Sequence, residues 1–113
     1  MNKDILVKRL KTEVRTFRDD NLNYFDDMYS KHVEGKNIKA NRKKSIDSRN
    51  YIRECLEKYE QAKDLLNKLN YIYMNYYKYC EPNKWNRDGL KAQLDELECK
   101  LNEFIDRLNS EDK

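Results

Sequence analysis

The residues that could perform chemistry in this chain of 113 residues are few and lie far apart. His32 is the only histidine, and neither a His-Glu-x-x-His motif nor a glycine-rich nucleophile turn accompanies it. A catalytic Ser–His or Cys–His pair would have to use this one imidazole. We therefore expect His32 to be an ordinary surface residue.

Three cysteines, Cys55, Cys80 and Cys99, occur without a Cys-x-x-Cys pair. An odd number at wide spacing is typical of a reducing compartment and not of a disulfide framework. On one continuous helix, Cys55 and Cys80 would lie about 37 Å apart, which is too far for a shared zinc ion. The sequence thus predicts no metal and no cofactor, with Cys55 and Cys80 in the core and Cys99 exposed.

Adjacent acids, at residues 19–20 and 26–27, are the other candidates for acid–base chemistry. Neighbouring residues on a helix point about 100° apart, so such a pair does not face one cavity. The two glycines of the chain are isolated, which leaves no glycine-rich loop to hold a phosphate. We predict a protein that is not an enzyme and has no small-molecule substrate.

The charge of the chain is concentrated in one segment. The whole sequence has 24 Lys+Arg and 21 Asp+Glu, a formal net charge of +3, but residues 35–53 contain a single acid, Asp47. The basic residues of this segment are candidates for binding an anion or an acidic partner: Lys36, Lys39, Arg42, Lys43, Lys44, Arg49 and Arg53. A solvated connection, binding to a nucleic-acid backbone and docking onto an acidic protein all stay open. Only Tyr51 lies among these cations, whereas a single-strand binder interleaves several aromatic rings.

Aromatic residues gather further along the chain and indicate a contact surface. The candidates for an interface are Tyr71, Tyr73, Tyr76, Tyr77, Tyr79 and Trp85. Tyrosine is enriched at interface hot spots because it offers apolar area and a hydroxyl group at a low entropic cost. Packing inside a helical core explains the same residues, and coding from an AT-rich genome raises the number of tyrosines, so both interpretations stay open.

The elements that must position these residues are helices. With 2 Gly and 1 Pro, the chain has too few turn residues for a β-rich or α/β fold. Apolar residues recur at alternating steps of three and four, as expected for helices over about 2–33, from a start within 35–48 to about 80, and over about 87–109. We predict a single all-α domain of three antiparallel helices.

Each predicted helix has one heptad seam, at residues 7–28, 52–80 and 90–108. A chain of this length has little core in which to bury three seams. We therefore expect self-association through coiled-coil seams into a homodimer or another homo-oligomer. Asn21, a polar residue in the first seam, is a candidate interface residue that would set the register.

Residues 35–48 decide between two architectures. Because the heptad positions before Ile52 are mostly polar, this segment is either a loop, with Ser45 or Ser48 capping the helix, or the start of a long helix. A helix over residues 37–80 would span about 66 Å and give an elongated assembly, whereas a later start gives a compact three-helix bundle. A connection of about ten residues is long for a bundle, which favours the elongated form.

No apolar stretch reaches the length of a secretory signal or of a membrane span. The longest uncharged stretch, residues 69–77, is interrupted by Asn70 and Asn75. We therefore expect a protein of the reducing cytoplasm that contacts no membrane.

Three functions fit these features. The leading prediction is a small non-enzymatic helical adaptor, assembly factor or inhibitor that binds a protein partner or a second copy of itself. The alternative is a nucleic-acid-binding protein that uses residues 36–53. A phage or mobile-element inhibitor of a host defence enzyme is a weaker alternative, suggested by the small size and the AT-rich coding.

Overall fold

Four α-helices make up most of the part of the chain that the computed structural model describes, residues 3–75, 79–81 and 84–111. They are α1 (Lys3–His32), α2 (Lys43–Leu56), α3 (Lys63–Met74) and α4 (Arg87–Glu111), with a 3-10 turn, η1 (Glu60–Ala62), directly before α3. Two-residue strands, β1 (Cys80–Glu81) and β2 (Lys84–Trp85), pair antiparallel ahead of α4. Apart from this short ladder, the all-helical fold that was predicted is confirmed.

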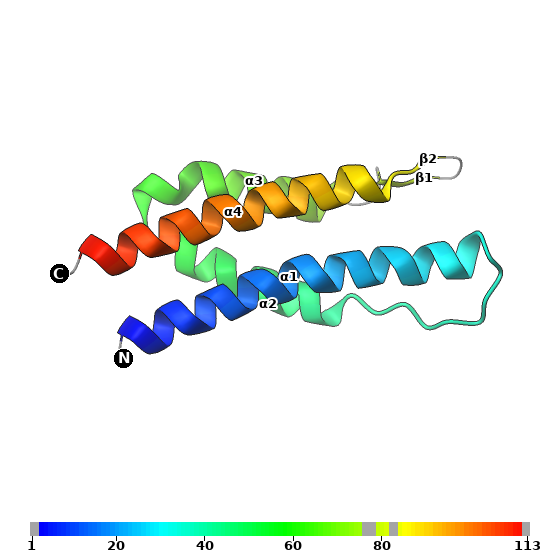
Figure 1. Cartoon of the computed structure of the whole chain (residues 1–113), viewed down its shortest axis with the longest axis horizontal. Coiled ribbons are helices and arrows are strands. Elements are labelled where there is room, and N and C mark those ends of the chain that lie inside the picture. Colours follow the sequence, from blue (N-terminus) through cyan, green and yellow to red (C-terminus); the bar gives the residue numbers. More distant parts are fainter. Residues whose placement is uncertain (1–2, 76–78, 82–83, 112–113) are drawn as a thin grey trace.

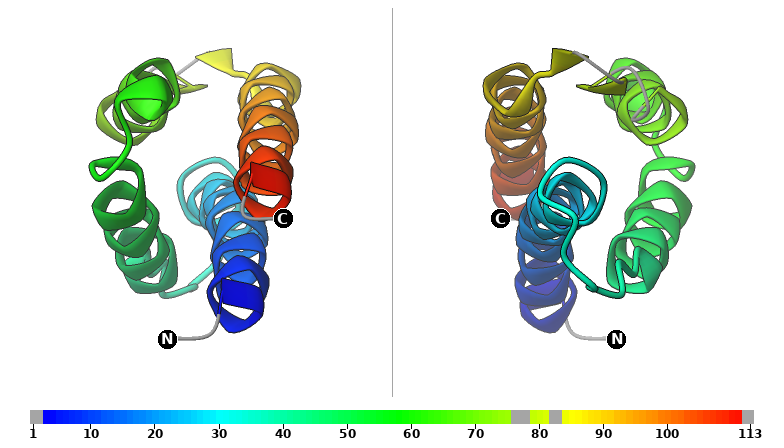
Figure 2. Two further views of the ribbon diagram at one scale, coloured as in Figure 1. Left: turned by 90° about the vertical axis from the view of Figure 1, so that its left-hand side faces the viewer. Right: turned by 90° about the vertical axis from the view of Figure 1, so that its right-hand side faces the viewer.

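The helices lie along the long axis of a molecule that measures 53 × 23 × 18 Å. Figure 1 shows α1 beside α4, with the N- and C-termini at the same end of the bundle. In the end-on views, α2 lies on the other side of α1, and α3 completes the bundle between α2 and α4 (Figure 2). None of the described helices combines the length and the apolarity that crossing a bilayer requires.

The prediction of a single helix that continues to about residue 80 is wrong. Helix α2 ends at Leu56, Tyr59 takes an extended conformation (φ −126°, ψ 120°), and the chain turns back into α3. The ring of Tyr59 packs edge-on against Phe104 of α4, with the ring centroids 5.6 Å apart. Leu56 and Ala62, on either side of the break, are 1 % and 0 % exposed, so turning back buries both halves of the predicted seam in one core.

The core joins apolar residues of all three predicted seams within one chain. It includes Leu10, Val14, Phe17, Ile52, Leu69, Leu90, Leu94, Leu97, Leu101 and Phe104. Asn21, which the sequence suggested for an interface between copies, is 1 % exposed, and its Nδ2 donates to the carbonyl of Phe17 at 2.6 Å. The structure therefore places Asn21 inside the intramolecular core.

Residues 33–42 form a loop, so the expectation of an elongated molecule built on a long helix is wrong. After α1, Gly35 adopts a left-handed conformation (φ 69°), and the N–H of Lys36 donates to the carbonyl of Ser30 at 3.0 Å. This is the usual way in which a glycine ends a helix. The loop is long because it runs back beside α1 before α2 begins (Figure 1).

Candidate binding surface

The N-terminus of α2 is closed by side chains of the chain itself. Oδ1 of Asn41 accepts the N–H of Lys43 at 2.8 Å. The carboxylate of Asp20, on α1, accepts the N–H of Ser45 at 2.8 Å. A carboxylate at this end of a helix is favoured by the helix dipole and offsets the basic residues around it. The N-terminus of α2 is therefore already occupied by an internal anion.

The predicted capping serines do not cap the helix. Ser45 and Ser48 lie inside α2 and are only 1 % and 2 % exposed. The hydroxyl group of Ser45 donates to the carbonyl of Arg42 at 2.9 Å. Small side chains at these positions let α2 approach α1 closely, which is why serines are found on the inner face.

The basic segment and the tyrosine group, which lie apart in the sequence, meet in the structure at Tyr73. The guanidinium carbon of Arg49 lies 4.0 Å from the centre of the Tyr73 ring, and that of Arg42 lies 4.8 Å from it. Arg42 also donates through Nη2 to the carbonyl of Tyr73 at 3.0 Å, and it lies 5.8 Å from the ring of Tyr24. Two arginines of the basic segment are thus held on the last turn of α3.

Arg49 and Arg53 lie one helical turn apart on α2, and each also has a partner close in sequence. Arg49 donates to Oδ1 of the adjacent Asn50 at 2.7 Å, and Arg53 lies 3.5 Å from the carboxylate of Glu57. The Nε atoms of both arginines are buried and have no hydrogen-bond acceptor. These Nε atoms are closed to a partner, but the Arg53 side chain is 37 % exposed, so its terminal N–H groups can be reached by an added carboxylate or phosphate.

The lysines of the basic segment behave differently from its arginines. Lys36 lies 3.3 Å from the carboxylate of Glu34. Lys39, Lys43 and Lys44 are exposed, and no ion pair is found for them within the described part of the chain. These three lysines are exposed cations, whereas Arg42 and Arg49 are in contact with Tyr73.

Two apolar side chains are exposed near the C-terminal end of α3. Tyr71 is 50 % exposed and Met74 is 65 % exposed, and both share the last turn of α3 with Tyr73. We refer to Arg49, Arg53, Tyr71, Tyr73 and Met74 as the α2–α3 surface. The surface joins cations and apolar area on two packed helices.

The other predicted interface residues lie elsewhere. Tyr76 and Tyr77 fall outside the described residues. Tyr79 is partly buried against the core. Trp85 packs edge-on against Phe25 and Tyr29, with each pair of ring centroids 5.6 Å apart, at the end of the bundle that carries the β-ladder. Of the tyrosine group, Tyr71 and Tyr73 are therefore the members found at the α2–α3 surface.

Sequence reasoning missed Met74 and Asp20. Met74 lies three residues after Tyr71, on the outer side of α3 opposite the buried Leu69 and Ile72, so helical spacing could have placed it. The role of Asp20 could not be read from spacing, because it depends on how α2 docks onto α1.

Three of the adjacent acids on α1 make different structural contacts. Asp19 pairs with Arg18, Asp20 holds the N-terminus of α2, and Asp26 lies 2.8 Å from Nε of Arg87. No two of these carboxylates are joined in a common site by the contacts found. Within residues 3–75, 79–81 and 84–111, no group of three His, Cys, Asp or Glu residues could hold a metal ion.

The thiols and the histidine have ordinary surroundings. Burial raises the pKa of the Cys55 thiol above its usual value, which keeps it protonated and poorly nucleophilic. Cys99 and His32 are both exposed. The side chain of Cys80 is outside the described part of the structure. The Cys55 thiol is therefore not an activated nucleophile.

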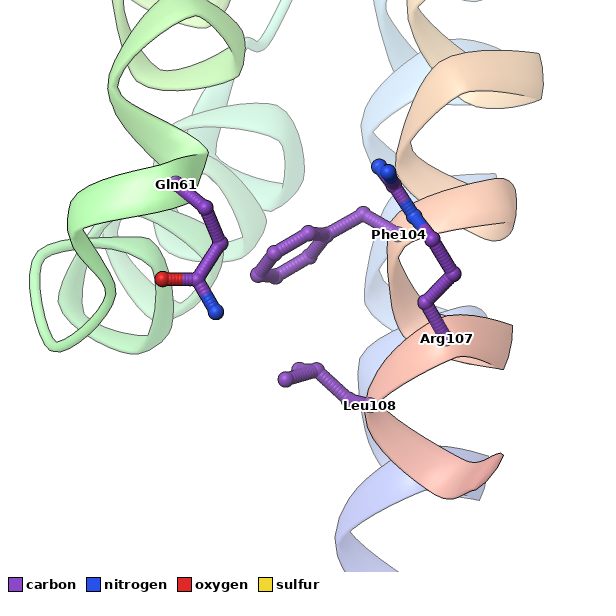
Figure 3. A pocket seen from close by; sticks show the side chains of 4 residues that line it. All are labelled: Gln61, Phe104, Arg107 and Leu108. Atoms are coloured by element: carbon purple, nitrogen blue, oxygen red, sulfur yellow. The ribbon is translucent and has the colours of Figure 1, made fainter. Parts of the chain in front are cut away.

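Two hollows occur on the described surface. One, of about 310 Å³, lies between η1 and α4 and is lined by Gln61, Phe104, Arg107 and Leu108 (Figure 3). The other, of about 350 Å³, lies between α1 and α4, where its cations already pair with Asp95 or Asp26: Arg18, Arg87 and Lys91. Comparison with protein-family models, with curated proteins and with solved structures finds no match for this chain.

Proposed function

We propose that the protein is a small non-enzymatic helical interaction protein that binds another protein through the α2–α3 surface. The observation that supports this is that Arg49 of α2 stacks on Tyr73, and that the turn of α3 with this ring also has the exposed side chains of Tyr71 and Met74. Arginine, tyrosine and methionine are enriched at the centres of protein interfaces, where lysine and acids are depleted. A guanidinium group that is already held by a ring loses less entropy on binding than a free one.

The proposed partner is a different protein and not a second copy. Apolar residues from all three predicted seams share one core within the chain, which favours a monomer over a coiled-coil dimer. Exposed Cys99 suits a reducing cytoplasm, which is where we propose that the protein acts. A phage-encoded inhibitor of a host enzyme would be one special case of such a protein binder.

Binding to nucleic acid is the second candidate, favoured by the exposed lysines. Lys39, Lys43 and Lys44 precede Arg49 and Arg53 along the loop and α2, as expected of a segment that contacts phosphates. This alternative predicts that binding weakens steeply as the salt concentration rises and that it does not need Met74.

The proposed function is tested by affinity purification from the native host with quantitative mass spectrometry. The wild-type chain is compared with a variant that carries Tyr71→Asp and Met74→Asp. The matched control carries Ile5→Asp and Val33→Asp, at two other exposed apolar residues, 59 % and 49 % exposed.

We expect the wild type and the control to enrich the same protein, and the Tyr71/Met74 variant to lose it while keeping its helical circular dichroism. Equal enrichment by all three chains, or recovery of nucleic acid in place of a protein, would contradict the proposed function.

A further inference from the structure

We infer that the α2–α3 surface binds an acidic amphipathic segment of its partner, with carboxylates on Arg49 and Arg53 and apolar side chains on Tyr71 and Met74. This inference rests on the proposed function and adds the chemistry of the partner. The evidence for it is the positive charge of the two arginines on α2 and the exposed apolar side chains on α3.

The two arginines match carboxylates in number and spacing. Arg49 and Arg53 are one turn apart, so their Cβ atoms lie about 5–6 Å from each other, the distance that also separates acids one turn apart on a partner helix. A guanidinium group binds a carboxylate through two parallel N–H donors. The ion pair that the described residues show for Arg53, with Glu57, measures 3.5 Å, and the Arg53 side chain is 37 % exposed.

The ring of Tyr73 holds one of these arginines in position. Arg49 lies over the ring at 4.0 Å, while Arg42 joins the same ring and the Tyr73 carbonyl from the N-terminus of α2. The contact fixes α2 against the end of α3 as well as the guanidinium group itself. The binding geometry is therefore set before a partner arrives.

The apolar half of the surface lies on the same turn of α3. Tyr71 and Met74 are three residues apart and so lie on neighbouring positions of one helical face. Their exposed areas give a partner's leucine or phenylalanine a place to bury apolar surface. The thioether of methionine adapts to differently shaped side chains.

The exposed lysines assist the approach of an acidic partner. Lys39, Lys43 and Lys44 lie on the loop and the first turn of α2, ahead of Arg49. Charges at the rim of an interface raise the association rate more than they raise the final affinity. We therefore expect these lysines to make the association rate depend on salt.

A protein segment fits this surface better than a nucleic-acid strand does. The ring of Tyr73 carries two arginines, so it offers little open face for a base to stack on. A row of phosphates offers no apolar surface that could cover the exposed side chain of Met74.

The test is a fluorescence-anisotropy titration of the full chain with a labelled helical peptide of about 20 residues. The peptide carries glutamates one turn apart and leucines on the adjacent face. Two further probes are the same peptide with glutamine in place of glutamate and a labelled single-stranded oligothymidine. We expect the glutamate peptide to bind about tenfold more tightly than the glutamine peptide.

The decisive variant carries Arg49→Gln and Arg53→Gln. Its matched control, Lys8→Gln with Arg107→Gln, removes two exposed charges from α1 and α4. We expect the arginine variant to lose affinity for the glutamate peptide by about tenfold or more, and the control by less than about twofold. Should circular dichroism show that the double variant is unfolded, Arg53→Gln alone and Tyr71→Ser are measured in its place, each with an expected loss of about threefold.

The outcomes separate the inference from the proposed function. If the host protein is captured through Tyr71 and Met74 but equally well by the arginine variant, the inference is wrong and the proposed function stands. If the oligothymidine binds more tightly than the peptide and the arginine variant loses that binding, the surface binds nucleic acid, and both are wrong. If the glutamate and glutamine peptides bind equally, the inference is overturned.

Discussion

At the scale of single residues, Tyr73 connects parts of the chain that the sequence keeps far apart. Its ring is in contact with Arg42 and Arg49, and its carbonyl accepts from Arg42. Each cation–π contact is worth about 0.5–1 kcal/mol at a partly exposed site. The residue thus stabilises the fold and at the same time positions the proposed binding groups.

Replacing Tyr73 should separate the contribution of the ring from that of the hydroxyl group. We expect Tyr73→Leu to lower the free energy of unfolding by about 1–2 kcal/mol, because two cation–π contacts are lost. Tyr73→Phe keeps the ring and should change it by less than about 0.5 kcal/mol. Urea denaturation measures both, and equal losses in the two variants would contradict this role of the ring.

Glu96 is the residue that should make stability depend on acid pH. Hydrogen bonds from Lys68 of α3 and from Lys100 lower its pKa from 4.5 to about 2. The unfolded chain therefore binds this proton at a higher pH than the folded chain does. The stabilisation by Glu96 is fully present above about pH 5 and is lost as the pH falls toward about 2.

We expect Glu96→Gln to weaken the dependence of stability on pH between about pH 5 and pH 2, and to lower stability at pH 7. Thermal melts followed by circular dichroism across this range measure the effect. The account of Glu96 is wrong if wild type and variant lose stability in parallel.

At the scale of elements, the bounds of α1 and α4 are the ones that the sequence predicted most accurately. Predicted helices over 2–33 and 87–109 correspond to Lys3–His32 and Arg87–Glu111. Both are single helices whose apolar period is visible in the sequence alone. The bounds of these helices follow from the spacing of apolar residues along the chain, which can be read from a single sequence.

The break between α2 and α3 could not be predicted from local spacing. Residues 57–59 contain neither glycine nor proline, and the apolar period continues through them. Tertiary packing overrides the local preference here, because the contact of Tyr59 with Phe104 exists only once α4 is in place. The contact between Arg49 and Tyr73 depends on the same reversal of the chain, so it could not be predicted from local spacing either.

Asp20 should stabilise α2 although it belongs to α1. We expect Asp20→Ala to cost about 1 kcal/mol, because the N–H of Ser45 loses its acceptor and the helix dipole loses its counter-charge. Asp27→Ala is the control, since no contact of that carboxylate is found within the described residues. Chemical denaturation compares the two, and an equal cost for both would show that Asp20 is not a cap.

At the scale of the whole molecule, the break between α2 and α3 decides whether a second copy is needed to cover apolar surface. A helix of about 66 Å would exceed the 53 Å length of the bundle and leave apolar surface for a second copy. With the helix divided, one chain buries apolar residues of all three predicted seams in a single core. The apolar area left on α3 is small, which suits a binding site and not a dimer core.

A single-chain core predicts a monomer in solution. We expect multi-angle light scattering to give 13.9 kDa at every protein concentration measured. Asn21→Leu should leave that mass unchanged, because Asn21 faces the internal core. A mass that doubles with concentration, or that changes in this variant, would restore the coiled-coil dimer.

The central claim is that the α2–α3 surface is where this protein binds. It is tested most directly by nuclear magnetic resonance of the isotope-labelled full chain, titrated with the glutamate peptide. The account predicts that the largest shifts of backbone signals lie around Arg49 and Arg53 and around Tyr71 and Met74. Shifts concentrated on α1 and α4, or spread evenly over the bundle, would contradict it.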